Sequence, residues 1–252
     1  LTSENSMPYL SLARGYKAGG FNTDGTLDED LRGFDSEFLW EIEGGIKGIS
    51  SNGAIRYRAA AFYDSRRDQQ VKSYVVRVRA DGSTEFIDLV GNAAEGTNLG
   101  IELEMDFDIS EVLALYANAG LLRAEFDEFI NEYGEDLSGR DQAQAPRYML
   151  SIGLRYESDS WFGDLAADAK DSFFFSDGDS LMSSSNTLIN GRIGFRKDNW
   201  TANLWGRNLT DEQVVIDGFA SFGNDPRKGY ITEPYLQFGE PRMLGLTLEM
   251  SL

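Results

Sequence analysis

The chain has 252 residues, of which 42 are acidic and 23 basic, so its formal net charge is −19. It contains neither Cys nor His, which excludes a disulfide framework, a zinc site of the usual type, a thiol nucleophile and a Ser-His-Asp triad. The acidic balance argues against nucleic acid as a partner, because phosphate backbones bind basic surfaces. No apolar run reaches the roughly 18 residues that a transmembrane helix needs.

Apolar and polar residues alternate along most of the chain, which predicts β-strands with one apolar and one polar face. Helical periodicity is weak throughout, so the sequence predicts an all-β protein. We expect ten strands, in chain order at 7–18, 36–49, 53–64, 86–107, 112–126, 147–157, 161–172, 187–197, 199–209 and 241–252. The clearest alternation is in the last strand, where the apolar positions are Leu244, Leu246, Leu248, Met250 and Leu252.

The joins between these strands alternate strictly between short and long. The expected long loops cover 19–35, 65–85, 127–146, 173–186 and 210–240. All of these except 65–85 are acidic, and the windows 19–36, 127–145, 171–186 and 210–240 together hold about −16 of the net charge of −19. Short turns at one end and long loops at the other are typical of an up-and-down transmembrane β-barrel. The nearly uncharged strand face agrees, since Lys or Arg at mid-bilayer costs roughly 2–4 kcal/mol.

Aromatic residues gather at the predicted strand ends, as expected at the two interfaces of a bilayer. Those near the short turns are Tyr156, Trp161, Phe162, Phe195 and Trp200. Those near the long loops are Phe126, Phe129 and Phe173–Phe175. We therefore expect two aromatic girdles.

The polar strand faces are themselves charged. Glu102, Glu104, Asp106 and Asp108 form one row, and like charges in a row repel one another. In a barrel this row faces a water-filled lumen, where basic rows such as Arg56–Arg58 and Arg192–Arg196 can form ion pairs with it. A soluble β-rich binding module with one buried face remains an alternative, because it would also alternate.

Several stretches resemble, in the right order, the β-barrel of TonB-dependent outer-membrane receptors, above all those for iron siderophores. The matching stretches lie at 12–22 (LARGYKAGGFN), 41–48 (EIEGGIKG), 59–64 (AAAFYD), 92–104, 190–211 and 240–242. The resemblance implies a 22-stranded barrel filled by an N-terminal plug. It also implies that this chain, residues 1–252, is the C-terminal part of that barrel, with the plug and the earlier strands absent. The family usually ends in an aromatic residue, whereas this chain ends in Leu252.

The resemblance also implies location and partners. We expect a protein of the Gram-negative outer membrane that contacts outer-membrane lipid and lipopolysaccharide. Its ligand would be a ferric siderophore or a similar scarce nutrient, and the TonB–ExbB–ExbD complex would supply energy through the missing plug. Nothing in the sequence indicates an enzyme, a catalytic residue, a cofactor or a bound metal.

The segment 65–85 differs from the other expected loops because it is rich in cations. Arg offers planar, bidentate recognition of carboxylates, and ferric siderophores are often anionic. We therefore take as candidate ligand-binding residues Arg66, Arg67, Lys72, Arg77 and Arg79. Contact with lipopolysaccharide, or solubility alone, would account for the same charges.

The sequence thus favours ligand-gated active import of a nutrient, with a ferric siderophore as the leading class. Cobalamin or an oligosaccharide would suit the same architecture. A passive porin or channel shares the strand pattern and remains an alternative.

Overall fold

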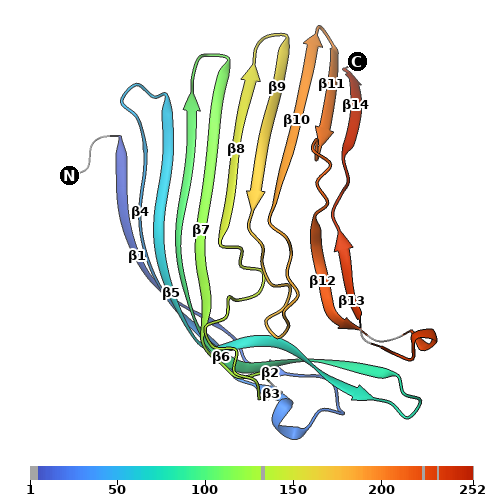
Figure 1. The fold of residues 1–252 in the computed structure, drawn as a ribbon. Coiled ribbons are helices and arrows are strands. Elements are labelled where there is room, and N and C mark those ends of the chain that lie inside the picture. Colours follow the sequence, from blue (N-terminus) through green and yellow to red (C-terminus); the bar gives the residue numbers. More distant parts are fainter. Residues whose placement is uncertain (1–4, 132–133, 223–224, 232, 252) are drawn as a thin grey trace.

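The computed structural model describes residues 5–131, 134–222, 225–231 and 233–251. In this part of the chain, ten strands form one antiparallel up-and-down sheet, in which sheet order follows chain order (Figure 1). They are β1 (Ser6–Lys17), β4 (Glu37–Ile49), β5 (Ile55–Val78), β6 (Thr84–Asp108), β7 (Leu113–Phe129), β8 (Tyr148–Glu157), β9 (Trp161–Lys170), β10 (Asn186–Lys197), β11 (Trp200–Arg207) and β14 (Met243–Met250). The all-β architecture and the ten expected strands are confirmed.

The loops contain short elements of their own. These are β2 (Gly20–Phe21), η1 (Glu29–Leu31), β3 (Gly33–Phe34), β12 (Val215–Phe222), η2 (Pro226–Lys228) and β13 (Glu233–Phe238). Strands β12 and β13 pair with each other beyond the ends of β11 and β14 (Figure 1). Among the described residues, no helix has both the length and the apolar character to cross a membrane.

One predicted loop is wrong. Residues 65–85 were expected to be a loop, but β5 continues to Val78 and pairs with the start of β6 around a tight turn. The sequence 71–78 is rich in β-branched residues, which favours the extended conformation. A bulge between Arg66 and Gln69, with Asp68 at a φ of 54°, re-aims the strand there. Beyond this bulge the hairpin bends and runs under the long-loop end of the sheet (Figure 1).

The long-loop end has small cores of its own. Leu27 packs with Ile87 and Leu89, so the loop between β1 and β4 lies on the bent hairpin. Phe126, which is fully buried, packs with Phe129 and other apolar residues of the hairpin and its neighbour: Val71, Ala94 and Leu137. These cores order the long loops against one another.

One face of the sheet is apolar and exposed. Residues paired across antiparallel strands share a face, and one such row runs Leu12–Ile42–Tyr63–Leu99. The exposed fractions of these four side chains lie between 45% and 71%. A water-soluble domain rarely leaves an apolar face this large uncovered. We call this the outward face.

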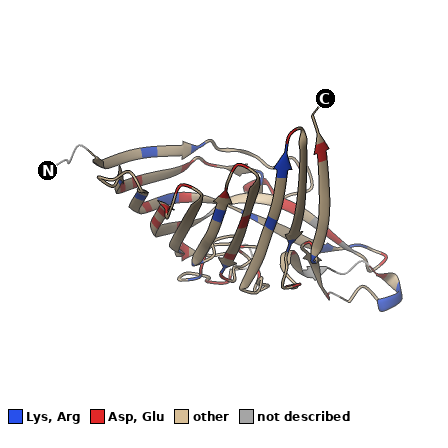
Figure 2. Cartoon of the chain, turned by 90° about the horizontal axis from the view of Figure 1, so that it is seen from above, with Lys and Arg blue, Asp and Glu red and all other residues tan. Residues whose placement is uncertain are grey.

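The opposite, inward face is polar, and several of its charges form ion pairs. Arg56 lies 2.9 Å from Asp108, and Arg58 lies 3.0 Å from Glu104. Arginines of β5 therefore form ion pairs with the acidic row of β6, as expected. The second basic row pairs elsewhere, Arg192 with Asp164 and Arg196 with Glu157. Figure 2 shows these charges spread over an open, curved sheet whose edge strands, β1 and β14, are apart.

Aromatic rings on the inward face lie over glycines of the paired strand. In alternate strand pairs an aromatic residue stands directly opposite a glycine, and a Cβ on that glycine would collide with the ring. The pairs are Tyr9–Gly45, Phe62–Gly100, Tyr116–Gly153, Phe162–Gly194 and Trp205–Gly245. Side-chain packing thus fixes the register of these strand pairs.

Candidate ligand-binding region

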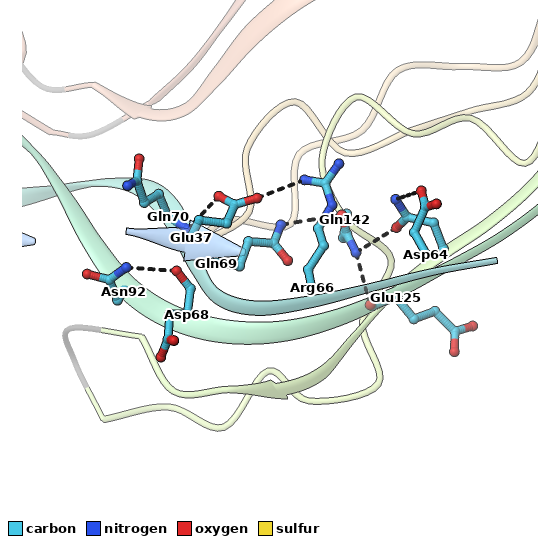
Figure 3. A network of polar contacts seen from close by, with 10 residues as sticks. Glu37, Asp64, Arg66, Asp68, Gln69, Gln70, Asn92, Glu125 and Gln142 are labelled. Atoms are coloured by element: carbon cyan, nitrogen blue, oxygen red, sulfur yellow. Dashed lines mark hydrogen bonds and ion pairs between the residues drawn. The ribbon is translucent and has the colours of Figure 1, made fainter. Parts of the chain in front are cut away.

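A buried polar cluster lies at the base of the bent hairpin, on the inward face (Figure 3). Glu37, only 8% exposed, begins β4 and accepts hydrogen bonds from two sides. Arg66 Nη1 donates to its Oε1 at 3.4 Å, and the backbone N–H of Gln70 donates to its Oε2 at 3.0 Å. The carboxylate therefore spans the bulge and holds β5 against β4.

A chain of amides continues from this cluster. Gln69 Nε2 donates to Gln142 Oε1 at 3.4 Å, and Gln142 Nε2 donates to Asn98 Oδ1 at 3.1 Å. Asn98 Nδ2 in turn donates to Asp64 Oδ2 at 3.3 Å. All four side chains are buried, and every donor points toward the Asp64 carboxylate, which accepts without donating. The loop between β7 and β8 is thereby linked, through Gln142, to the inward face of β5 and β6.

Three buried atoms of this region have no hydrogen-bond partner within the described residues: Asp64 Oδ1, Arg66 Nε and Gln69 Oε1. Unpaired buried polar groups are costly and therefore rare. The base of the hairpin thus retains both donor and acceptor capacity in its buried polar groups.

The same bulge also holds the loop between β1 and β4. Gln70 Nε2 donates to the carbonyls of Ala18 and Asp35, each at 2.9 Å. Asn92 Nδ2 donates to the carbonyls of Asp35 at 3.0 Å and Asp68 at 2.7 Å. Two long loops and one hairpin therefore meet at a single irregularity of β5.

The five candidate cations do not converge on one site. Arg66 points inward to Glu37, whereas Arg67 is paired with Phe38 and therefore lies on the outward face. Lys72 is exposed on the distal hairpin. Arg77 Nη2 donates to the Thr26 carbonyl at 2.6 Å, and Arg79 pairs with Glu85 at 3.2 Å near the hairpin tip. Their assignment to a ligand stays a prediction.

The loop between β7 and β8 also contacts the loop between β9 and β10, through Arg140 and Asp177. Asp177 Oδ1 accepts the backbone N–H of Ala143 at 2.7 Å, and Arg140 stacks on Phe174 at 4.0 Å from the ring centroid. Burial raises the pKa of Asp177, against the opposing effects of the Ala143 N–H and of Arg140. Burial likewise lowers the pKa of Arg140. This loop contact therefore responds to protonation.

The aromatics of the short-turn end lie as the alternation requires. Tyr156, Trp161 and Trp200 are 42–53% exposed on the outward face, and the rings of Trp161 and Phe195 are 4.9 Å apart. Phe162 is different, because it points inward, is buried, and has Arg196 over its ring at 4.6 Å. The assignment of the other four to a membrane interface stays a prediction.

The expected second girdle is wrong. Phe126 and Phe129, at the end of β7, are buried in the core between β7 and the bent hairpin. Phe173 and Phe175 are buried against each other, with ring centroids 5.5 Å apart. The loops, rather than the membrane-facing surface, take these rings. Sequence position next to long loops could not distinguish the two environments.

The last strand pairs with β11 along its whole length. Its apolar positions project outward and are 49–69% exposed: Leu244, Leu246, Leu248 and Met250. Leu252 lies outside the described residues. The role of this strand in assembly stays a prediction.

Sequence reasoning missed the polar cluster. Glu37, Gln69, Asn98 and Gln142 carry no motif, and they come from four separate segments of the chain. A usable signal was the repeated amide of Gln69–Gln70 directly before the β-branched stretch 71–78, since buried amides need partners.

The fold and its two faces define one section of the wall of an antiparallel β-barrel. The family model "TonB dependent receptor-like, beta-barrel" matches residues 1–209. The chain therefore belongs to the β-barrel family of TonB-dependent receptors, and its relatives are receptors and transporters rather than enzymes. Barrels of this family are outer-membrane proteins of Gram-negative bacteria.

Similar proteins include siderophore receptors. The pesticin receptor of Yersinia pestis is 22% identical over 216 residues, covering 84% of this chain and 30% of the receptor. The ferric yersiniabactin uptake receptor FyuA of the same organism has a TM-score of 0.76 at 18% identity, over 98% of this chain and 35% of FyuA. The siderophore receptor PiuA of Acinetobacter baumannii gives 0.72 at 15% identity, over 98% and 34%.

A copper transporter, OprC, also has this fold, with a TM-score of 0.68 at 14% identity over all of this chain and 38% of OprC. At these identities the likeness to solved structures shows the fold alone. The chain spans about a third of the length of the relatives that it matches.

Proposed function

We propose that this chain is the C-terminal part of the barrel of an outer-membrane receptor that imports a ferric siderophore by TonB-dependent transport. The observation that carries the proposal is the pairing of an exposed apolar outward face with a charged inward face in a family whose neighbours include siderophore receptors. A lipid-facing wall and a polar lumen account for both faces.

In this proposal the rest of the protein supplies the plug and the earlier strands. The plug contacts TonB, and the TonB–ExbB–ExbD complex supplies the energy for import. Strands β1 and β14 are the two edges of the sheet. Within a bilayer the backbone N–H and C=O groups of such edges must be paired with other strands. The earlier strands would close them.

The ligand would meet the long-loop end first. We infer contact with the bent hairpin and with Arg66, whose Nε has no hydrogen-bond partner within the described residues. A guanidinium at the lumen mouth suits an anionic chelate. The loops around Arg66 are acidic and would repel an anion. The ligand would therefore need its negative charge concentrated where it can contact the Arg66 guanidinium.

Copper import is a second candidate, because a copper transporter shares the fold. Copper prefers imidazole, thiolate and thioether ligands, and these 252 residues hold no His, no Cys and six Met. The residues of this chain therefore suit an anionic chelate better than a bare copper ion. A passive channel would need no plug, and the sequence preceding Leu1 tests that alternative.

Growth under iron limitation tests the proposal. A strain lacking the receptor should fail to grow on one siderophore, and the complete gene should restore growth. In the restored strain, Arg66→Gln should weaken binding of that siderophore, while Lys228→Gln, far along the chain in η2, serves as a matched loss of charge. Equal growth of deletion and wild type on every siderophore would contradict iron import.

A further inference from the structure

Two apolar side chains interrupt the polar inward face near its long-loop end. Met149 pairs with Gly120, and Gly120 pairs with Glu102 of the acidic row, so all three lie on the inward face. Leu188 pairs with Asp168 and lies on the same face, one row nearer the short turns. Met149 is 56% exposed, and neither side chain belongs to the aromatic–glycine pairs of this face.

Both side chains line a pocket of about 550 Å³. The start of β12 completes its apolar lining, with Val214, which is 8% exposed, and Ile216, which is 44% exposed. Figure 1 shows β12 beside the long-loop end of β10. Small-molecule pockets commonly have volumes of roughly 300–1,000 Å³, so this pocket has a suitable size for a ligand.

The pocket contains a cation without an acidic partner. Lys170, the last residue of β9, pairs with Met149 and therefore lies beside it on the inward face. Its Nζ lies 4.6 Å from the centroid of the Phe173 ring, and within the described residues it forms neither an ion pair nor a hydrogen bond. The Asp168 carboxylate, two residues away, instead accepts a hydrogen bond from Ser151 Oγ at 2.7 Å. The Lys170 ammonium is therefore free to pair with a negatively charged group.

The charges on the two sides of the pocket have opposite signs. Lys170 lines the pocket from β9, and Glu102 lines it from β6. Both belong to one row of paired residues, which passes through Gly120 and Met149, so they are separated by roughly 14 Å along the sheet. An anionic group would be attracted to Lys170 and repelled by Glu102. The apolar side chains lie between the two charges.

We propose that this pocket binds an apolar substituent of an anionic iron chelate, namely an alkyl or aromatic group that carries a carboxylate. The inference rests on the proposed function and names the class of chelate; it places a ligand contact on β8–β10, apart from the bent hairpin. Met149, Leu188, Val214 and Ile216 would remove the apolar group from water, and the flexible Met149 thioether adapts to its shape. Lys170 would form an ion pair with the carboxylate.

The test uses the complete receptor, purified in detergent, and three ferric catecholate probes. Their chelators are dihydroxybenzoyl-phenylalanine, dihydroxybenzoyl-glycine, which lacks the benzyl group, and dihydroxybenzoyl-phenylalaninamide, which lacks the carboxylate. Equilibrium dialysis measures the dissociation constant of each complex. The wild-type receptor should bind the phenylalanine complex roughly tenfold more tightly than either of the others. Equal affinity for the phenylalanine complex and either other complex, or no binding of any probe, would overturn the proposal.

Two variants separate the apolar contact from the charged one. Met149→Gln should remove the preference for the benzyl group, whereas Met182→Gln, at a 40% exposed loop side chain outside the pocket, should keep it. Lys170→Gln should remove the preference for the carboxylate over the amide, whereas Lys197→Gln, at the short-turn end of β10, should keep it. A wild-type preference in Met149→Gln or in Lys170→Gln would show that the pocket does not bind the probe.

A pocket filled by another segment of the same protein would give a different result. Met149→Gln would then lower the melting temperature of the receptor without changing its preference among the probes, which contradicts the proposal. The proposed function fails separately. If the deletion strain grows like wild type on every siderophore while the purified receptor still discriminates among the probes, iron import is wrong and the pocket assignment stands. If the receptor imports a siderophore and Met149→Gln keeps the wild-type preference, only the pocket assignment is wrong.

Discussion

The two ends of the sheet reach order by different means. At the short-turn end, turns such as the one at Gly53, where φ is +75°, close neighbouring strands directly, and the aromatics Trp161 and Trp200 stay half exposed on the outward face. At the long-loop end, Phe126 and Leu27 are almost completely buried in cores where loop residues pack on the bent hairpin. The short-turn end is stabilised by local turns and by whatever covers its outward aromatics. The long-loop end is stabilised by tertiary packing.

The largest expected effect comes from the buried ring at the long-loop end. Phe126→Ala should destabilise the packing of the β7–β8 loop on the hairpin by about 3–5 kcal/mol, because it removes a fully buried ring. Hydrogen exchange should show that loop opening while the strands stay protected. Trp161→Ala, at a side chain 50% exposed, is the control and should leave loop exchange unchanged. Similar loop opening in both variants would remove the contrast between the two ends.

The wall between the two ends is expected to respond next. A Cβ at Gly153 would collide with the Tyr116 ring, so Gly153→Ala should cost about 1–3 kcal/mol through overpacking. Gly120→Ala in the neighbouring strand is the matched control, because the nearest atom to its Cβ, the Met149 carbonyl oxygen, is 3.9 Å away. The urea midpoint of the complete receptor measures both. A midpoint lowered equally by both substitutions would mean that the ring does not fix the register.

A smaller effect is expected where the β7–β8 loop meets the polar cluster. Gln142→Ala removes the amide that bonds both Gln69 and Asn98, so their buried polar groups lose a hydrogen-bond partner. The expected loss of stability is about 1–3 kcal/mol. Limited proteolysis of the β7–β8 loop should become faster. Gln144→Ala, which loses one bond to the Phe175 carbonyl, should have less effect. Unchanged cleavage for Gln142→Ala would show that the amide chain does not hold the loop.

The smallest expected effect depends on pH. Burial raises the folded-state pKa of Asp177 above its ordinary value of 3.8, so the folded loop binds a proton more tightly than the unfolded loop does. The loop contact should therefore be strongest below pH 3.8 and should weaken as pH rises from there through the raised pKa. Asp177→Asn keeps an acceptor for the Ala143 N–H and should abolish this dependence. Proteolysis at several pH values measures it, and an identical pH profile in the variant would exclude Asp177 as the cause.

Much of the wall could be predicted because its signal is local. A period of two needs only neighbouring residues, and it correctly placed the exposed row from Leu244 to Met250 and the charged row from Glu102 to Asp108. It also separates Trp161 from Phe162, although both aromatics were expected at the interface. For Phe162 the alternation correctly predicts an inward side chain, whereas its position near a strand end wrongly placed it at the interface.

The candidate site could be predicted far less well. Arg66 and Arg67 looked like one basic pair in a loop, but β5 continues through them and turns them to opposite faces. The amide of Gln142 reaches Gln69 across 73 residues of sequence, and no local pattern reports such a contact.

By itself the sequence determined an all-β chain, ten strands in an up-and-down order, and a concentration of negative charge in the loops at one end. These follow from side-chain alternation and from turn lengths, which act between neighbours in the chain. Only the tertiary structure decided that 65–85 is a hairpin, that Phe126 is buried in a core, and that Arg67 lies on the outward face. Those outcomes depend on contacts between distant segments, where burial and hydrogen bonding across strands outweigh local preference.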